Sequence, residues 1–250
     1  MGKSPSLVRL DALLVKRGLA ASRQRAQELI EEGAVLVNGL VAKKSAMRVR
    51  PDQPILLKKE DYPWVGRGAL KLLGALEPFD VTCTDDVCAD FGASTGGFTQ
   101  VLLHRGAKKV YAIDVGRGQL DWKLRTDDRV IVMEETNVRH LESLPEPIDL
   151  IVGDLSFISL KLILPTVAKF LRAGGQAVLL IKPQFEVGRD AVEKGGIVRS
   201  DHERSQAIER ILQDARDQGF TVLNGADCIV PGAKAGNVEY FTHLQWDPSS

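Results

Sequence analysis

VCADFGASTGGFTQ, residues 87–100, predicts a short buried strand, a turn of small residues and the first turn of a helix. The strand ends at Gly92, and the helix begins near Gly97 and stops at Gly106. Glycines let the backbone approach a ligand without a Cβ clash, and the first N–H groups of a helix have no partner within it. The segment therefore predicts a ligand-binding turn at a helix N-terminus.

A carboxylate also follows the next predicted strand. Residues 109–113 form this strand, and Asp114 ends it 24 positions after Asp90. Nucleotide-binding α/β units place an acid there for the ribose hydroxyls, so we predict a nucleotide-like ligand between the two strand ends. The predicted cofactor-binding residues are Asp90, Gly92, Ser94, Gly96 and Asp114, with Asn137, after the strand ending at Met133, for the adenine.

The spacing of the glycines narrows the class of ligand. Gly92, Gly96 and Gly97 do not form the dinucleotide fingerprint G-x-G-x-x-G, and no lysine follows them as in a phosphate-binding P-loop. An acid at Asp90 would repel a pyrophosphate but suits a ligand with a cationic amino group. S-adenosylmethionine carries such a group, so we predict a methyltransferase. The alternative is a helix–strand packing turn with solvated acids.

Strands alternate with helices through the rest of the chain. Predicted strands at residues 130–133, 149–154 and 177–181 indicate a parallel doubly wound sheet, which binds ligands at the carboxyl ends of its strands. Residues 220–223 and 238–244 predict a closing hairpin that makes the last strand antiparallel. The predicted fold class is α/β, a Rossmann-like doubly wound sheet of the class I S-adenosylmethionine methyltransferase type.

The composition sets outer limits on the function. A chain of 250 residues, 44% hydrophobic and 26% charged, can bury one sizeable core and a small second one. No apolar run approaches the ~18 to 20 residues of a membrane span, and the first ten residues lack a signal-peptide core, so we expect a cytoplasmic protein without a membrane partner. The three cysteines form no C-x-x-C pair, which predicts buried thiols and no metal site.

The first 60 residues differ from the rest in charge. They hold 12 Lys and Arg against 6 Asp and Glu, a net +6, although the whole chain has a net charge of zero. A basic front end on an acidic body suggests a polyanionic partner, with merely solvated charge as the alternative. Two helices are predicted near residues 9–17 and 23–32, and Asn38-Gly39 predicts a tight hairpin after them.

The chain over about residues 7–60 resembles the S4 RNA-binding module, with two short helices, one of which bears arginines, and a hairpin. We therefore expect an S4-like domain at residues 1–60, a linker at 61–66 and a methyltransferase domain at 67–250. Asp11 is interpreted as an acid that complements the dipole of its helix. The predicted RNA-binding residues, of which Arg23 and Arg25 are expected to point outward, are Arg9, Lys16, Arg23, Arg25, Lys43 and Lys44.

Five separated motifs resemble the TlyA (hemolysin A) family, whose body is similar to FtsJ-type RNA 2′-O-methyltransferases. They are RGALKL at 67–72, DFGASTGGFT at 90–99, GDLSF at 153–157, LIKPQFE at 180–186 and GNVEY at 236–240. The resemblance covers nearly the whole chain. It implies a catalytic Lys-Asp-Lys-Glu tetrad carried by Lys71, Asp154, Lys182 and Glu239.

The resemblance also implies a reaction. S-adenosylmethionine would methylate a ribose 2′-hydroxyl of ribosomal RNA within ribosomal subunits, with cytidine as the expected nucleotide and no metal. Lys182 would take the hydroxyl proton or stabilise the alkoxide, while Asp154 and Glu239 orient the two lysines and Lys71 helps to position the hydroxyl. The sequence predicts no oligomeric state.

Other functions remain open at this stage. The tetrad residues could instead form two surface salt bridges, the common arrangement of such side chains. The chain could also be an RNA-binding assembly protein with an inactive methyltransferase body. A membrane-lytic protein is the third alternative, and neither spanning segments nor basic amphipathic helices of membrane type support it.

Overall fold

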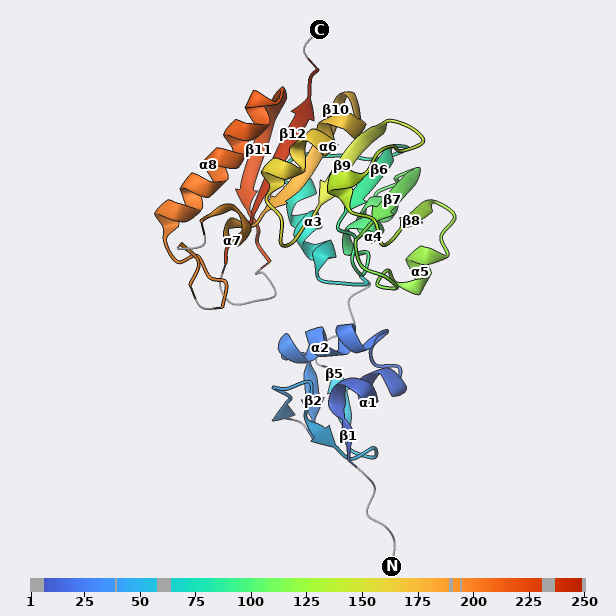
Figure 1. Cartoon of the computed structure of the whole chain (residues 1–250). Helices are drawn as coiled ribbons and strands as arrows, with labels where there is room; N and C mark the ends of the chain where they lie inside the picture. Colours follow the sequence, from blue (N-terminus) through green and yellow to red (C-terminus); the bar gives the residue numbers. More distant parts are fainter. Residues whose placement is uncertain are drawn as a thin grey trace, which may run out of the picture. The chain divides into compact units, whose positions relative to one another are not determined.

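The computed structural model describes residues 7–38, 40–57, 64–188, 191–193, 195–230 and 237–248. The chain divides into two compact units, Met1–Gly66 and Arg67–Ser250. Figure 1 shows the course of the chain through both. Each unit has its own core and is described by itself. The expected linker lies partly outside the described residues, since these resume at Trp64.

The larger unit is built on a seven-stranded sheet with the order β11-β12-β10-β9-β6-β7-β8. The five strands from β10 to β8 run parallel, so their carboxyl ends share one edge. These strands are β6 (Val87–Phe91), β7 (Lys109–Ile113), β8 (Val130–Met133), β9 (Ile148–Gly153) and β10 (Leu171–Ile181).

The last two strands reverse the direction of the sheet. β12 (Tyr240–Trp246) runs antiparallel to β10 and to β11 (Phe220–Asp227) and lies between them. Tyr240 pairs with Ile181, so the start of β12 meets the end of β10. The predicted doubly wound sheet with an antiparallel last strand is confirmed, and this reversal brings Glu239 to the edge where the parallel strands end.

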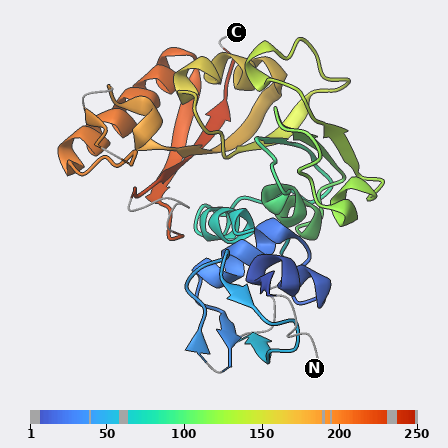
Figure 2. The same cartoon turned by 60° about the horizontal axis from the view of Figure 1, so that its bottom comes forward.

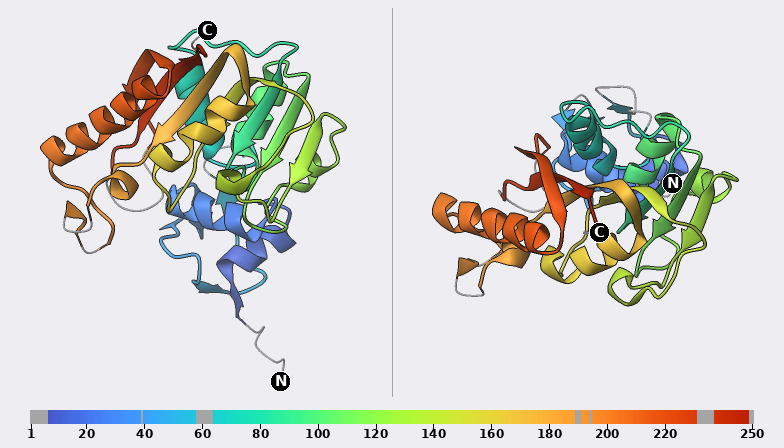
Figure 3. Two further views of the ribbon diagram at one scale, coloured as in Figure 1. Left: turned by 45° about the horizontal axis from the view of Figure 1, so that its top comes forward. Right: turned by 90° about the horizontal axis from the view of Figure 1, so that it is seen from above.

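Helices cover both faces of the sheet (Figure 3). One face carries α6 (Leu164–Phe170) and α8 (Asp201–Asp217), whose apolar residues share a core cluster with the strands. α3 (Gly68–Leu76) and α4 (Gly97–His104) lie on the other face.

No helix in the described part of the chain is long and apolar enough to cross a membrane. Short helices complete the unit: α5 (Trp122–Arg125), η1 (Val138–His140), η2 (Leu160–Leu162) and α7 (Pro183–Glu186).

The turn between β6 and α4 is held by a buried carboxylate. Asp90 Oδ2 accepts hydrogen bonds from the Thr99 backbone N–H at 2.9 Å and from its hydroxyl at 2.7 Å. Gly92 and Gly96 have φ values of +87° and +95°, and a Cβ at Gly96 would lie 2.2 Å from Leu124 Cδ1. Both glycines are therefore required by backbone conformation, and at Gly96 also by packing.

The smaller unit packs two helices against short strands (Figure 2). Its core combines leucines of α1 (Leu10–Lys16) and α2 (Arg23–Glu31) with valines of the strands. β1 (Val8–Arg9) pairs with β4 (Arg48–Val49), and β3 (Leu40–Val41), β2 (Val35–Val37) and β5 (Ile55–Leu57) form a three-stranded sheet. β2 and β3 pair antiparallel around Asn38, which has a φ of +52°; Gly39 lies outside the described residues.

Leu164→Ala should lower the free energy of unfolding of the larger unit by about 2 to 5 kcal/mol, because it empties space in the core under α6. Leu164 is fully buried, whereas Leu162, two residues earlier, is exposed. Urea unfolding of both variants measures the difference. Leu162→Ala should cost less than about 1 kcal/mol, and equal losses would contradict the assigned core.

Asp90→Asn should change how stability depends on pH. Burial raises the pKa of Asp90 to about 7, despite the opposing hydrogen bonds from Thr99. A raised carboxyl pKa contributes stability that is complete near pH 4 and is lost as the pH rises through about 7. Urea unfolding should therefore show wild type losing up to about 4 kcal/mol relative to Asp90→Asn over this window. A constant difference would show that the buried carboxyl does not titrate there.

Candidate active site

Four charged side chains converge at the carboxyl edge of the large sheet. Lys71 comes from α3, Asp154 follows β9, Lys182 follows β10 and Glu239 precedes β12. Lys71 Nζ lies 2.6 Å from Glu239 Oε2 and 3.4 Å from Asp154 Oδ2. Lys182 Nζ lies 2.5 Å from Asp154 Oδ1. The four residues predicted to form the tetrad thus make a continuous row of contacts, in which Asp154 joins the two lysines and Glu239 contacts Lys71.

The tetrad is electrically neutral and largely buried. Its two lysines and Glu239 are buried, and Asp154 is only partly exposed. Removing single charges from water is costly unless they are paired, and each charge here has an opposite partner within 3.4 Å. These contacts also account for Lys71 near a helix N-terminus, where the dipole disfavours a cation. The alternative of exposed surface salt bridges does not fit this burial.

The directions of the pKa shifts indicate the charge states of Lys71 and Asp154. Burial alone would lower the pKa of Lys71, but Asp154 and Glu239 outweigh it and raise this pKa above its ordinary value. Burial alone would raise the pKa of Asp154, but the charges of Lys182 and Lys71 together lower it. Lys71 therefore stays an ammonium group and Asp154 a carboxylate, so Lys71 can act electrostatically but not as a base.

Ser156 is a member of the site that the sequence analysis missed. Its hydroxyl oxygen accepts a hydrogen bond from Lys182 Nζ at 2.7 Å. Asp154 and Ser156 together fix the direction of this ammonium group. The GDLSF motif contains both residues, but a serine carries no charge that would single it out in a sequence. Its position two residues after a strand-end acid is the signal that was available.

Two cavities meet at this edge of the sheet. One, of about 510 Å³, is lined by Gly92, Ser94, Asp114 and Asn137, and the other, of about 410 Å³, is lined by the four tetrad residues. The lining of both includes Asp154, Ser156 and Phe157. A group bound in the first cavity therefore lies next to a substrate bound in the second.

The larger cavity has the donors and acceptors that a nucleoside requires. Asp114 Oδ2 accepts a hydrogen bond from the Ser94 N–H at 2.9 Å, and Oδ1 accepts one from the Gly116 N–H at 2.7 Å. These bonds fix the carboxylate and leave lone pairs for ribose hydroxyls. The volume is in the usual range of ~300 to 1,000 Å³ for small-ligand sites. S-adenosylmethionine therefore fits the residues present.

Two residues that were predicted to contact the cofactor do not line the larger cavity as the structure describes it. Asp90 and Gly96 are absent from the described lining of the larger cavity. Asp90 lies behind the turn, where one oxygen holds Thr99 and Oδ1 is buried with no hydrogen-bond partner among the described residues. Asn137 lines the cavity, although its Oδ1 accepts the Arg139 N–H at 3.0 Å. Gln119 also lines the cavity and was not predicted; its Oε1 accepts a hydrogen bond from the Ser94 hydroxyl at 3.3 Å.

Phe157 stands at the junction of the two cavities in a strained conformation. It has a φ of +64°, and 88% of its surface is exposed. Its ring lies 5.2 Å from that of Phe185, with 46° between the planes. Left-handed backbone is costly for a bulky residue and persists where surrounding contacts impose it. An exposed aromatic surface is thus held beside the tetrad.

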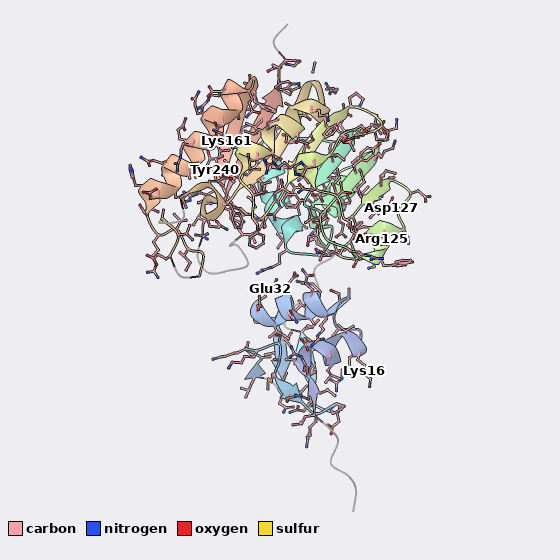
Figure 4. The ribbon with its side chains drawn as sticks, viewed as in Figure 1. Lys16, Glu32, Arg125, Asp127, Lys161 and Tyr240 are labelled. Atoms are coloured by element: carbon pink, nitrogen blue, oxygen red, sulfur yellow. The ribbon has the colours of Figure 1, made fainter. Side chains whose placement is uncertain are left out.

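The predicted RNA-binding residues divide into three groups. Lys16, labelled in Figure 4, and Lys43 and Lys44 are exposed. Arg9 and Arg23 both contact Asp11. The prediction that Arg25 points outward is wrong: it is 3% exposed and forms ion pairs with Glu28 at 3.3 Å and Glu32 at 3.5 Å. Arg25 lies four residues before the buried Leu29, which places it on the inner stripe of α2.

The described residues contain no group of three His, Cys, Asp or Glu side chains that could hold a metal ion. All three cysteines are buried free thiols. The tetrad itself consists of paired ammonium and carboxylate groups, with the Ser156 hydroxyl beside Lys182.

Comparison with known families covers both units. The FtsJ-like methyltransferase family matches residues 64–246, and the S4 domain matches residues 8–55. A 16S/23S rRNA (cytidine-2′-O)-methyltransferase, TlyA of Mycobacterium tuberculosis, is 46% identical over 95% of this chain and 89% of its own length. Hemolysin A of Brachyspira hyodysenteriae is 40% identical over 95% of this chain and 99% of its own length.

Solved structures agree with these matches. A structure from Streptococcus thermophilus described as a hemolysin superposes with a TM-score of 0.78 at 41% identity, covering 98% of this chain and 90% of that one. The N-methyltransferase NodS of Bradyrhizobium japonicum, with S-adenosyl-L-homocysteine, has a TM-score of 0.51 at 17% identity over 76% of this chain and 90% of its own; it shows the fold alone. The chain belongs to the FtsJ-like methyltransferases and, within them, to the TlyA family, in which an S4 domain accompanies the methyltransferase.

Proposed function

We propose that this protein transfers a methyl group from S-adenosylmethionine to the ribose 2′-hydroxyl of a cytidine in ribosomal RNA. The observation that carries the proposal is the pairing of Lys71 and Lys182 through one carboxylate, Asp154, at the wall shared by two cavities. The rRNA cytidine-2′-O-methyltransferase of M. tuberculosis, at 46% identity, supports the same reaction.

The larger cavity is the proposed cofactor site. Asp114 would accept hydrogen bonds from the ribose hydroxyls of S-adenosylmethionine, and Gly92 and Ser94 would lie against it, since all three line the cavity. Asn137 remains the proposed adenine contact. Asp90 and Gly96 would act indirectly by shaping the turn. When bound, S-adenosylmethionine supplies a methyl group made electrophilic by a positively charged sulfur.

Lys182 is the residue assigned to the hydroxyl proton. An ammonium group has three hydrogens, and Asp154 and Ser156 account for two directions around Nζ, so one remains for the substrate oxygen. As a neutral amine Lys182 accepts the proton, and as an ammonium it stabilises negative charge on the oxygen. Lys71, held charged by Glu239 and Asp154, contributes positive potential. The contacts of Lys182 and the raised pKa of Lys71 support Lys182 rather than Lys71 as the group at the substrate oxygen.

The smaller unit is the proposed contact with RNA. Its S4 match suits a phosphate backbone, and so do its exposed cations Lys16, Arg23, Lys43 and Lys44 and the half-buried Arg9. We propose that residues 1–60 bind ribosomal RNA within ribosomal subunits, that 61–66 form a linker and that 67–250 carry the methyltransferase. The cytoplasm, where ribosomal subunits are found, is the proposed location.

A labelling experiment tests the reaction directly. The protein is incubated with methyl-labelled S-adenosylmethionine and ribosomal subunits from a strain that lacks this activity. A 2′-O-methyl group blocks alkaline cleavage of the adjoining phosphodiester, so label should appear in alkali-resistant dinucleotides with a 5′ cytidine. Label in mononucleotides would indicate base methylation, and absence of label would favour an RNA-binding protein with an inactive body.

Lys182→Ala should lower kcat for methyl transfer by at least ~100-fold, the usual contribution of a positioned proton-transfer group. The affinity for S-adenosylmethionine should change little, because Lys182 lines only the smaller cavity among the described residues. Single-turnover rates and calorimetric titration measure the two quantities.

Lys161→Ala is the matched control for this variant. Lys161, labelled in Figure 4, is an exposed lysine that pairs with Asp214 at 2.8 Å outside the two cavities. Its removal should leave the rate unchanged. Normal turnover by Lys182→Ala, or an equal loss in both variants, would remove Lys182 from the mechanism.

A further inference from the structure

Asp11, at the start of α1, gathers three polar side chains of the smaller unit. Its side chain has 0% exposure. Arg9 donates from Nε to Oδ1 at 3.0 Å and from Nη2 to Oδ2 at 2.8 Å. Arg23 Nε and Gln27 Nε2 donate to Oδ2 at 3.2 and 3.1 Å, and the Ala12 N–H donates to Oδ1 at 2.8 Å. One carboxylate therefore fixes residues from the beginnings of both helices.

The two arginines remain open to solvent although their carboxylate partner is covered. The side chains of Arg9 and Arg23 are 37% and 57% exposed. Among the described residues, Arg9 uses Nε and one Nη2 hydrogen on Asp11, and Arg23 uses only Nε. Both guanidinium groups therefore keep N–H donors for another ligand. The cluster carries two positive charges and one negative, which leaves a net charge of +1.

Asp11 keeps its charge under all ordinary conditions. The hydrogen bond from Arg9, with those from Gln27, Arg23 and the Ala12 N–H, lowers the pKa of Asp11 well below the usual carboxyl range, against the opposing effect of burial. A carboxylate that served only the helix dipole would need none of these side-chain donors. Asp11 therefore binds two arginines and a glutamine in addition to the helix-dipole role that we inferred from the sequence.

We propose that Asp11 is a positioning residue that holds Arg9 and Arg23 as a preformed pair of guanidinium groups for the phosphates of RNA. The inference rests on the proposed RNA binding by the smaller unit. Two free guanidinium groups repel each other, and each loses rotamer freedom when it binds a phosphate. A buried carboxylate between them offsets the repulsion and fixes both side chains before RNA arrives, which favours binding.

The proposal predicts that Asp11→Asn weakens RNA binding, although the change in net charge alone would strengthen it. Asp11→Asn makes the protein more positive by one unit, which by itself would tighten binding to a polyanion. Loss of the preformed pair should instead weaken binding of the full-length protein to purified 16S and 23S rRNA by about 5- to 10-fold. The plot of log affinity against log salt should become shallower by about 1 to 2, one unit for each lost phosphate contact.

Asp52→Asn is the matched control, because it adds the same charge to the same unit. Asp52 is exposed and pairs with the exposed Arg50 at 3.5 Å. Its affinity for rRNA should be equal to or tighter than that of wild type. Binding by Asp11→Asn that equals that of Asp52→Asn would overturn the proposal.

Salt dependence separates a positioning role from a general loss of folding. If Asp11→Asn only reduced the folded fraction, affinity would fall by one factor at every salt concentration and the slope would stay unchanged, which would also overturn the proposal. Arg9→Ala and Arg23→Ala test the underlying RNA assignment. Wild-type binding by both would refute RNA contact at this surface, whereas weakened binding by both with normal binding by Asp11→Asn would refute only the role of Asp11.

Discussion

The arrangement of the larger unit depends on one carboxylate held between two ammonium groups. Asp154 contacts Lys71 through Oδ2 and Lys182 through Oδ1, and Glu239 balances the charge of Lys71. Four charges in a largely buried cluster are tolerable only when all are paired, so loss of one member leaves an uncompensated charge. This constraint couples α3, the ends of β9 and β10 and the start of β12. The reversed direction of β12 is what brings the fourth charge to the same edge.

The cofactor turn and the tetrad are joined by a short segment. Residues 154–157 follow β9 and provide Asp154, Ser156 and Phe157 to the walls of both cavities. In this segment Phe157 combines a left-handed backbone, which is costly for a bulky residue, with an exposed ring. A single connection can thus align a methyl donor, a lysine and a substrate, which is the positioning that in-line transfer requires.

The sequence predicted the architecture well because its signals are local and repeated. Strand–helix alternation and the closing hairpin predicted the sheet, and the five motifs of the family resemblance implied the tetrad. The sequence predicted the contacts of individual side chains less well. Arg25 was placed outward although its spacing from Leu29 puts it on the buried stripe of α2. Asp90 and Gly96 support the turn from behind, and the contacts of Ser156 and Asp11 arise only when distant segments meet. The periodicity of a sequence indicates which face of a helix or strand a residue occupies, but not which distant residue packs against that face.

A titration of the lysine side chains tests the central electrostatic claim. In protein labelled with ¹³C-lysine, the Cε resonance of Lys71 should titrate above the ordinary lysine pKa of 10.5, because Asp154 and Glu239 outweigh the effect of burial. In Asp154→Asn, the same resonance should titrate at lower pH. A Lys71 that titrates below its ordinary value in wild type, or that is unaffected by Asp154→Asn, would contradict the account of a tetrad organised by one carboxylate.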